Sequence, residues 1–267
     1  MGVFVNFASM TQNKPLILIS NDDGITAPGI RNLVDAVKHL GEVVIVAPDS
    51  PQSAMGHAVT ISKPLRLNQT DIYGDIKAYQ CSGTPADCVK LAVDKVLHRK
   101  PDLMVSGINH GSNSSINVLY SGTMSAAMEA AIEGIPAVGF SLCDFAYDAD
   151  FSLSKKIATR IAENILEHGL PTATLLNVNI PKITESEFKG MRICRQAVAK
   201  WKEDFDERID PNGRKYFWLT GKFINNDTGE DTDEWALANN YASVVPVMFD
   251  LTAHHAMPRL NSWDNSI

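Results

Sequence analysis

Short runs rich in β-branched residues alternate with helical periodicity over residues 16–176. This alternation is typical of a parallel sheet whose strands are joined by crossover helices. The first strand is predicted over Leu16–Ser20, an apolar run that leads into a polar loop, Asn21–Ala27. An apolar run without polar interruption indicates a strand that is buried on both faces of the sheet.

A helix is predicted directly after this loop. Pro28 favours the first helical turn because its fixed φ matches the helix. The apolar residues that follow are spaced i, i+3, i+4, i+7 and therefore share one face: Ile30, Leu33, Val34 and Val37. We expect Gly41 to end this helix and Val43–Ala47 to form the second strand.

The same pattern continues through the following hundred or so residues. Thr84, with Asp87 three residues later, resembles a capping box and starts a helix. The elements expected here are helices over 85–97, 123–133 and 152–168 and strands over 103–106, 137–142 and 174–178. The fold class predicted is α/β, with a doubly wound, mostly parallel, Rossmann-like sheet.

The amino-acid composition changes after Pro181, where polar and aromatic residues become more frequent. We expect a C-terminal arm or hairpin in this region, and we interpret the acidic stretch 225–234 as a solvated loop, with an interface or a lid over the site as the alternative. The chain is thereby divided into an N-terminal extension (1–13), an α/β catalytic core (14–185) and a C-terminal extension (186–267) that completes the domain and contributes to oligomerisation.

The amino-acid composition limits the kinds of partner that this protein is expected to bind. The formal net charge of -7 disfavours long nucleic acid, whose phosphates an acidic surface repels. A small phosphorylated substrate remains compatible with this charge, because one bound cation reverses the local field. The four cysteines form no Cys-x-x-Cys pair, and no export signal or membrane span is visible, so we expect a cytoplasmic protein with reduced thiols.

Oxygen-bearing side chains follow the predicted strands, at the edge where doubly wound sheets bind ligands. Asp22 and Asp23 leave the first strand together, Ser53 lies in the loop after the second, and Asn109 follows the strand that begins at 103. Two adjacent carboxylates are costly to hold together without a compensating cation, hydrogen bonds or water. An all-oxygen set selects Mg²⁺ or Mn²⁺ over Zn²⁺. Asp-Asp-Gly is also an ordinary turn sequence, and that alternative stays open.

A second group indicates an anion site. Ser121, Gly122 and Thr123 stand at a predicted helix start, where unpaired backbone N–H groups and two hydroxyls face a phosphate. Asn113 is a further amide donor in a nearby turn. The alternatives are that Ser121 caps the helix and that Asn113 tolerates a left-handed backbone.

Three other features have a structural and a functional interpretation. The turn over residues 82–87 is expected to cap a helix, or to line a pocket for a base or sugar as well. His57 and His110 lie in candidate loops, where each is a pocket residue or a proton donor. His254 and His255 are interpreted as solvent-facing or capping residues.

Read together, these motifs resemble the SurE (survival protein E) family from residue 15 to about residue 253. The first group of matching runs is Ile19–Ile25, Ala47–Asp49 with Ser53–Ala54 and Gly56–His57, and Gly83–Val89. The second group is Ser106–Asn109 with Gly111 and Asn113, Tyr120–Thr123, Asn177–Pro181, Tyr216–Gly221 and Thr232–Asp233 with Trp235–Ala236. Ser112 departs from the proline expected in that turn, which removes no ligand.

The resemblance implies a 5′/3′-nucleotidase, a hydrolase acting on nucleoside monophosphates, with exopolyphosphatase activity in some members. It implies one divalent cation per subunit, Mg²⁺ or Mn²⁺, held by Asp22, Asp23, Ser53 and Asn109. It implies a phosphate held by Asn113, Ser121, Gly122 and Thr123, and a homodimer or homotetramer formed by exchange of C-terminal elements.

The predicted mechanism is hydrolysis by a water activated at the metal, with Asp22, Asp23 and Asn109 as catalytic residues and Asp23 preferred as the base. The Asp-x-Asp pair of phosphatases that form a phosphoaspartate is absent, so no covalent intermediate is expected. The alternative from another class is a nucleotide-sensing protein without turnover. A dinucleotide oxidoreductase is less favoured because no strand is followed by Gly-x-Gly-x-x-Gly.

Overall fold

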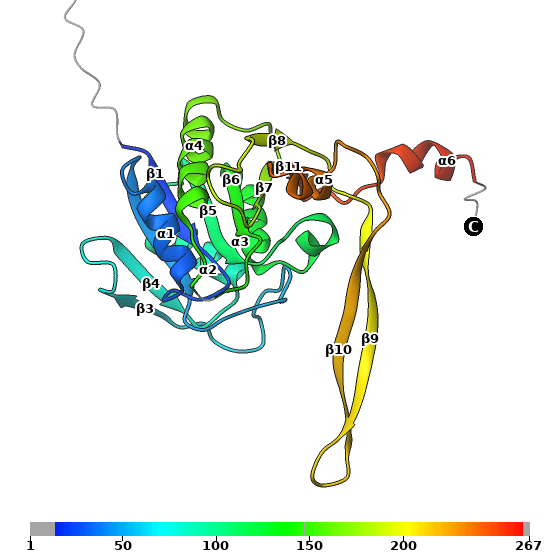
Figure 1. Ribbon diagram of the computed structural model, residues 1–267. Coiled ribbons are helices and arrows are strands. Elements are labelled where there is room, and N and C mark those ends of the chain that lie inside the picture. Colours follow the sequence, from blue (N-terminus) through cyan, green and yellow to red (C-terminus); the bar gives the residue numbers. More distant parts are fainter. Residues whose placement is uncertain (1–13, 147, 264–267) are drawn as a thin grey trace, which may run out of the picture.

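The computed structural model describes residues 14–146 and 148–263. The predicted N-terminal extension, 1–13, lies outside the described residues. The described chain folds around one large sheet with helices on both faces, and a long two-stranded hairpin projects from it (Figure 1). Among the described residues, no helix has the length and apolar character needed to cross a bilayer.

The large sheet has the strand order β3-β4-β2-β1-β5-β6-β7-β11-β8. Its strands are β1 (Leu16–Ser20), β2 (Glu42–Pro48), β3 (Leu67–Thr70), β4 (Lys77–Cys81), β5 (Leu103–His110), β6 (Ala137–Leu142), β7 (Thr174–Ile180), β8 (Met191–Ile193) and β11 (Ala242–Met248). All neighbours pair in parallel except β3 with β4 and β11 with β7. The predicted doubly wound, mostly parallel fold is confirmed.

The helices divide between the two faces as the period-2 pattern of the central strand requires. The first face is covered by α1 (Pro28–Val37) and α4 (Ser152–His168), which pack on Ile17 and Ile19. The second face is covered by α2 (Pro85–Leu91), the π-helical turn Ala92–Val96 and α3 (Gly122–Ile132), which pack on Leu16 and Leu18. Because β1 is buried on both faces, its side chains serve two separate apolar cores.

Several predicted boundaries need correction. The first helix ends at Val37 and not at Gly41, where a close approach to the carbonyl of Pro15 demands glycine. The predicted helix over 85–97 is α-helical only to Leu91 and continues as the π-helical turn. The capping box of Thr84 and Asp87 is present at its start. The strands predicted over 103–106 and 174–178 extend to His110 and Ile180.

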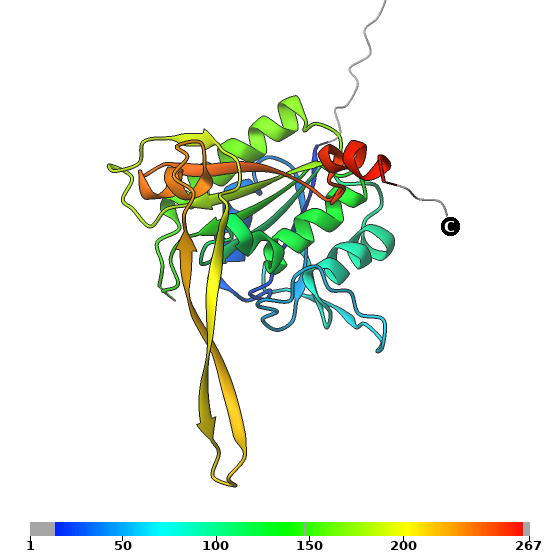
Figure 2. The same cartoon turned by 90° about the vertical axis from the view of Figure 1, so that its right-hand side faces the viewer.

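The C-terminal part contributes both to the sheet and to the projecting hairpin. β11 inserts between β7 and β8 and so adds to the core sheet. β9 (Ala199–Ile209) and β10 (Lys215–Asn225) pair antiparallel along their whole length and extend away from the body (Figures 1 and 2). Beyond them lie α5 (Asp233–Ala238), the 3-10 turn His254–Ala256 and α6 (Met257–Asn261). A hairpin in this region agrees with the sequence expectation.

Candidate active site

The point where the strand order reverses lies between β1 and β5, since the chain adds strands on one side of β1 before it returns to build the other. A cavity of about 330 Å³ lies among the loops that follow the strands here. It is lined by Asp22, Asp23, Ser53, Ala54, Asn109, His110, Gly111, Ser112, Asn113, Asn117, Tyr120, Ser121 and Phe145. Of the predicted site residues, Gly122 and Thr123 are not in its lining.

Among the residues that line this cavity, Asp22 has the most strongly shifted pKa. It follows β1 and is only 5% exposed, and this burial raises its pKa from 3.8 to about 6. The hydroxyl of Thr123 donates a hydrogen bond of 2.6 Å to Oδ1 and opposes the rise, while the charge of Asp23 adds to it. The ionised form of Asp22 therefore lacks sufficient compensation from the described protein groups, which is the condition that a bound cation would relieve.

Gly122 explains how Asp22 fits against the start of α3. A Cβ at position 122 would lie 2.6 Å from the Cβ of Asp22 and 2.9 Å from its Oδ2. Only glycine allows the backbone of α3 to approach the carboxylate so closely. Gly122 and Thr123 thus both act on Asp22, and their predicted contact with a phosphate stays a prediction.

Asp23 lies beside His110. Its Oδ2 is 3.4 Å from both the backbone N and the ring Nδ1 of His110. The ring packs edge-on against Phe151, and its Nε2 is buried without a hydrogen-bond partner in the described chain. His110 consequently carries a buried ring nitrogen that no described protein group satisfies.

The two neutral ligands predicted for the cation fit an oxygen site. The side-chain nitrogen of Asn109 donates to the carbonyl of Gly111 at 2.8 Å, so its oxygen is the atom left for a ligand. Ser53 lies in the same cavity, and the neighbouring Gln52 N–H donates to the carbonyl of Asp22 at 2.7 Å. No group of three or more His, Cys, Asp or Glu side chains suited to a metal occurs within residues 14–146 and 148–263. The residues thus fit a hard cation held by two carboxylates, a hydroxyl and an amide.

The loop that carries Ser53 is fastened to two helices. The His57 ring is 2.8 Å from Glu129 of α3, which also pairs with Lys90 of α2 at 2.5 Å. Burial acts to raise the pKa of Glu129, but the hydrogen bonds from His57 and Lys90 outweigh it and lower that pKa. The Thr84 hydroxyl donates to the carbonyl of Ala58 at 2.7 Å. His57 and the 82–87 turn therefore anchor this loop and are not among the residues that line the cavity.

At the other side of the cavity, Ser121 caps α3 by accepting a hydrogen bond of 3.0 Å from the N–H of Met124, so the capping role is confirmed. Asn113 is held on three sides. Its side-chain nitrogen donates to the Ser141 hydroxyl, its N–H to Asn179 Oδ1, and its carbonyl accepts from Asn177, each at 2.8 Å. The contact of Asn113 with a phosphate remains untested.

The supporting roles of three residues around the cavity were not predicted from the sequence. Asn177 and Asn179 alternate with apolar residues in the buried strand β7, a pattern that could have indicated an inward polar network. Glu129 lies on α3 among small apolar residues, and its polarity there was the available signal. Each contact spans at least 39 positions of sequence, which hides the partner from any local pattern.

The acidic stretch 225–234 is a solvated loop only in part, which corrects the sequence interpretation. Asp233 is fully buried and accepts hydrogen bonds from the N–H groups of Ser115 at 2.7 Å and Ala197 at 2.9 Å. Glu234 accepts one from the Ser114 hydroxyl. The stretch therefore ties the base of the hairpin to the loop that follows β5.

Fold and cavity together define an α/β protein with an acidic, oxygen-lined site beside a helix start at the switch point of its sheet. Comparison with known families agrees. The family model described as Survival protein SurE matches residues 17–203, and the chain belongs to the SurE family.

Curated relatives match nearly the whole chain. A protein of Christiangramia forsetii named 5′-nucleotidase SurE is 63% identical over 95% of this chain and 98% of its own length. One of Bacteroides fragilis with the same name is 46% identical over 96% of this chain and 100% of its own. The crystal structure of the SurE protein from Aquifex aeolicus superposes with a TM-score of 0.80 at 40% identity, covering 92% of this chain and 98% of that one.

Proposed function

We propose that this chain is a phosphoric monoester hydrolase that converts nucleoside 5′- and 3′-monophosphates to nucleoside and phosphate, with one divalent cation, Mg²⁺ or Mn²⁺, per subunit. The name 5′-nucleotidase of the relatives supports the 5′ activity. The observation that carries the proposal is the buried Asp22 beside Asp23, in a cavity that also holds Ser53 and Asn109.

These four residues would hold the cation, which when bound supplies charge neutralisation for the transferring phosphoryl group and activation of water. Asp23 is more exposed than Asp22 and is proposed as the base that accepts the proton of the attacking water. The two adjacent carboxylates and Asn109 thus share the catalytic role.

The phosphate is proposed to bind at the start of α3. The first N–H groups of this helix have no partner within it and carry the positive end of its dipole. Ser121 and Asn113 line the cavity and add polar atoms. The backbone N–H groups of Gly122 and Thr123, the first residues of α3, are proposed to complete the phosphate site. A polyphosphate end presents the same terminal group, so exopolyphosphatase activity belongs to the same proposal.

The hairpin is proposed as the element through which subunits form a homodimer or homotetramer, and residues 186–267 as an extension to the 14–185 core. Its exposed apolar side chains support this role: Trp201, Phe205, Ile209, Tyr216, Phe217, Trp218 and Leu219. The four cysteines are free thiols, which supports a reducing compartment such as the cytoplasm.

Turnover of AMP, other 5′- and 3′-monophosphates and short polyphosphate by the purified protein, measured with Mg²⁺ and Mn²⁺ separately, tests the proposal. Asp22→Asn should abolish phosphate release, whereas Asp35→Asn, an exposed carboxylate on α1, should leave it unchanged. Thermal melts of both variants confirm folding. Binding of AMP without release of phosphate across the panel would favour the alternative, a nucleotide-sensing protein.

A further inference from the structure

A second cavity adjoins the first, and one aromatic ring belongs to both. The second cavity measures about 330 Å³ and is lined by Asp23, Thr26, Ala27, Pro28, His110 and Phe145. It shares Asp23, His110 and Phe145 with the cavity described above. A ligand whose phosphate lies near Ser121 can therefore extend past Phe145 into this second space.

Phe145 is unusually placed for an apolar side chain. The residue is 83% exposed, and most of the residues that line the same cavity are polar or small, so no apolar core of the described chain covers it. Its ring lies against the backbone of Gly111, where a Cβ would meet ring atoms at 2.2 to 2.9 Å. One edge of the ring is thus seated on a residue without a side chain, and most of its surface is open to solvent.

The turn that presents this ring is held in place. Asp144 accepts hydrogen bonds of 3.0 Å from the N–H of Ala146 and from the Lys182 ammonium. The N–H of Asp144 donates to the carbonyl of Leu142, at the end of β6. The residues on both sides of Phe145 therefore make backbone hydrogen bonds, which position the segment that carries the exposed ring.

We propose that Phe145 is the platform on which the nucleobase of the substrate stacks, with the base entering the cavity beside Ala27 and Pro28. This rests on the proposed function, because it assigns the nucleoside end of the same substrate. A flat aromatic base matches a solvent-open phenyl ring, and stacking on such a ring is tolerant of base identity because every base has a π-face. Phosphate and ribose, both strongly hydrated, gain little from this surface.

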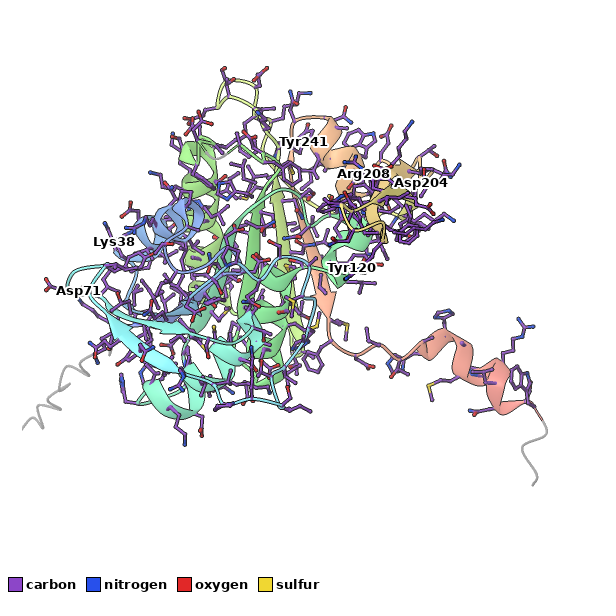
Figure 3. All side chains as sticks on the ribbon, turned by 90° about the horizontal axis from the view of Figure 1, so that it is seen from below. Lys38, Asp71, Tyr120, Asp204, Arg208 and Tyr241 are labelled. Atoms are coloured by element: carbon purple, nitrogen blue, oxygen red, sulfur yellow. The ribbon has the colours of Figure 1, made fainter. Side chains whose placement is uncertain are left out.

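Tyr120 is the competing platform. It is 53% exposed, lines the first cavity and lies on the side of the body from which the hairpin projects (Figure 3). It is absent from the lining of the second cavity, whereas Phe145 belongs to both. The geometry therefore favours Phe145 for the base and leaves Tyr120 beside the phosphate.

The test compares AMP with ribose 5-phosphate, which lacks the base, in steady-state turnover. Phe145→Ala should raise KM for AMP by roughly 10-fold, within the range of about 5- to 150-fold expected for one lost stack, and leave ribose 5-phosphate within about 2-fold. Phe145→Trp should restore the wild-type KM for AMP. Phe145→Leu, which keeps apolar bulk without a π-face, should behave like Phe145→Ala.

Equal effects of Phe145→Ala on both substrates, or no effect on AMP, would overturn the platform while leaving the proposed hydrolase intact. A selective loss of AMP affinity in Tyr120→Ala and not in Phe145→Ala would assign the base to Tyr120 instead. A wild-type protein that binds AMP without turnover would refute the hydrolase. In that case the same variants, compared by calorimetric binding of AMP and ribose 5-phosphate, decide the platform separately. Size-exclusion chromatography must show an unchanged assembly for every variant.

Discussion

Asp22→Asn is expected to stabilise the metal-free protein at neutral pH while it abolishes turnover. The change keeps the size of the side chain and an oxygen that accepts from Thr123, but removes the ionisation. The pKa of Asp22 is raised from 3.8 to about 6, chiefly by burial. Between these values the folded state holds more protons than the unfolded state, so this group's contribution falls as pH rises from about 4 to 6 and is lost above.

At 1.36 kcal/mol for each pH unit between the two values, the ionised carboxylate costs the folded state about 3 kcal/mol at pH 7 and about half of that at pH 5. Urea unfolding in chelator should therefore show Asp22→Asn more stable than wild type by up to these amounts, with the difference vanishing at about pH 3, below the unfolded pKa of 3.8. Mn²⁺ at 1,000 times Kd should reverse the order, because binding to the folded state then stabilises wild type by about 4.1 kcal/mol. A variant that is less stable in chelator, or a difference independent of pH, would refute this reasoning.

Two further substitutions test how the cavity is supported. Glu129→Ala should lower stability by about 2 kcal/mol and weaken Mn²⁺ affinity. It removes the His57 hydrogen bond that holds the Ser53 loop to α3 and the Lys90 bond that joins α2 to α3. Glu129→Gln should recover part of both, and unchanged Mn²⁺ titrations in the alanine variant would speak against the anchor. Gly122→Ala should lower the free energy of unfolding, measured in urea, by about 1–3 kcal/mol and raise KM for Mn²⁺, because its Cβ would lie 2.6 Å from the Cβ of Asp22. Wild-type kinetics in this variant would show that the close approach is dispensable.

The local hydrophobic pattern was sufficient to give the bounds of three elements. The strands Leu16–Ser20 and Ala137–Leu142 and the helix Ser152–His168 have the predicted bounds, because an uninterrupted apolar run or a sustained helical stripe identifies each. β3 is the edge strand of the sheet and β4 is its neighbour; both are partly exposed and were not predicted. Their polar sequences offer little contrast with a loop.

For the site, the sequence predicted which loops meet, since parallel strands end at one edge of the sheet. It did not predict the orientation of each side chain. Thr123 was assigned to a phosphate, yet its hydroxyl donates to Asp22 across 101 positions, and buried Asp233 contacts Ser115 across 118. Such contacts arise from tertiary packing, which no spacing rule records. SurE family membership, by contrast, is confirmed, because several ordered motifs are far more specific than any one of them.

The most direct measurement is phosphate release from AMP by exhaustively chelated protein, followed by titration with Mn²⁺. We expect turnover to disappear on chelation and to return with added cation in wild type and in Asp35→Asn, but not in Asp22→Asn. Full turnover in the chelated wild type, with no detectable bound metal, would contradict this expectation.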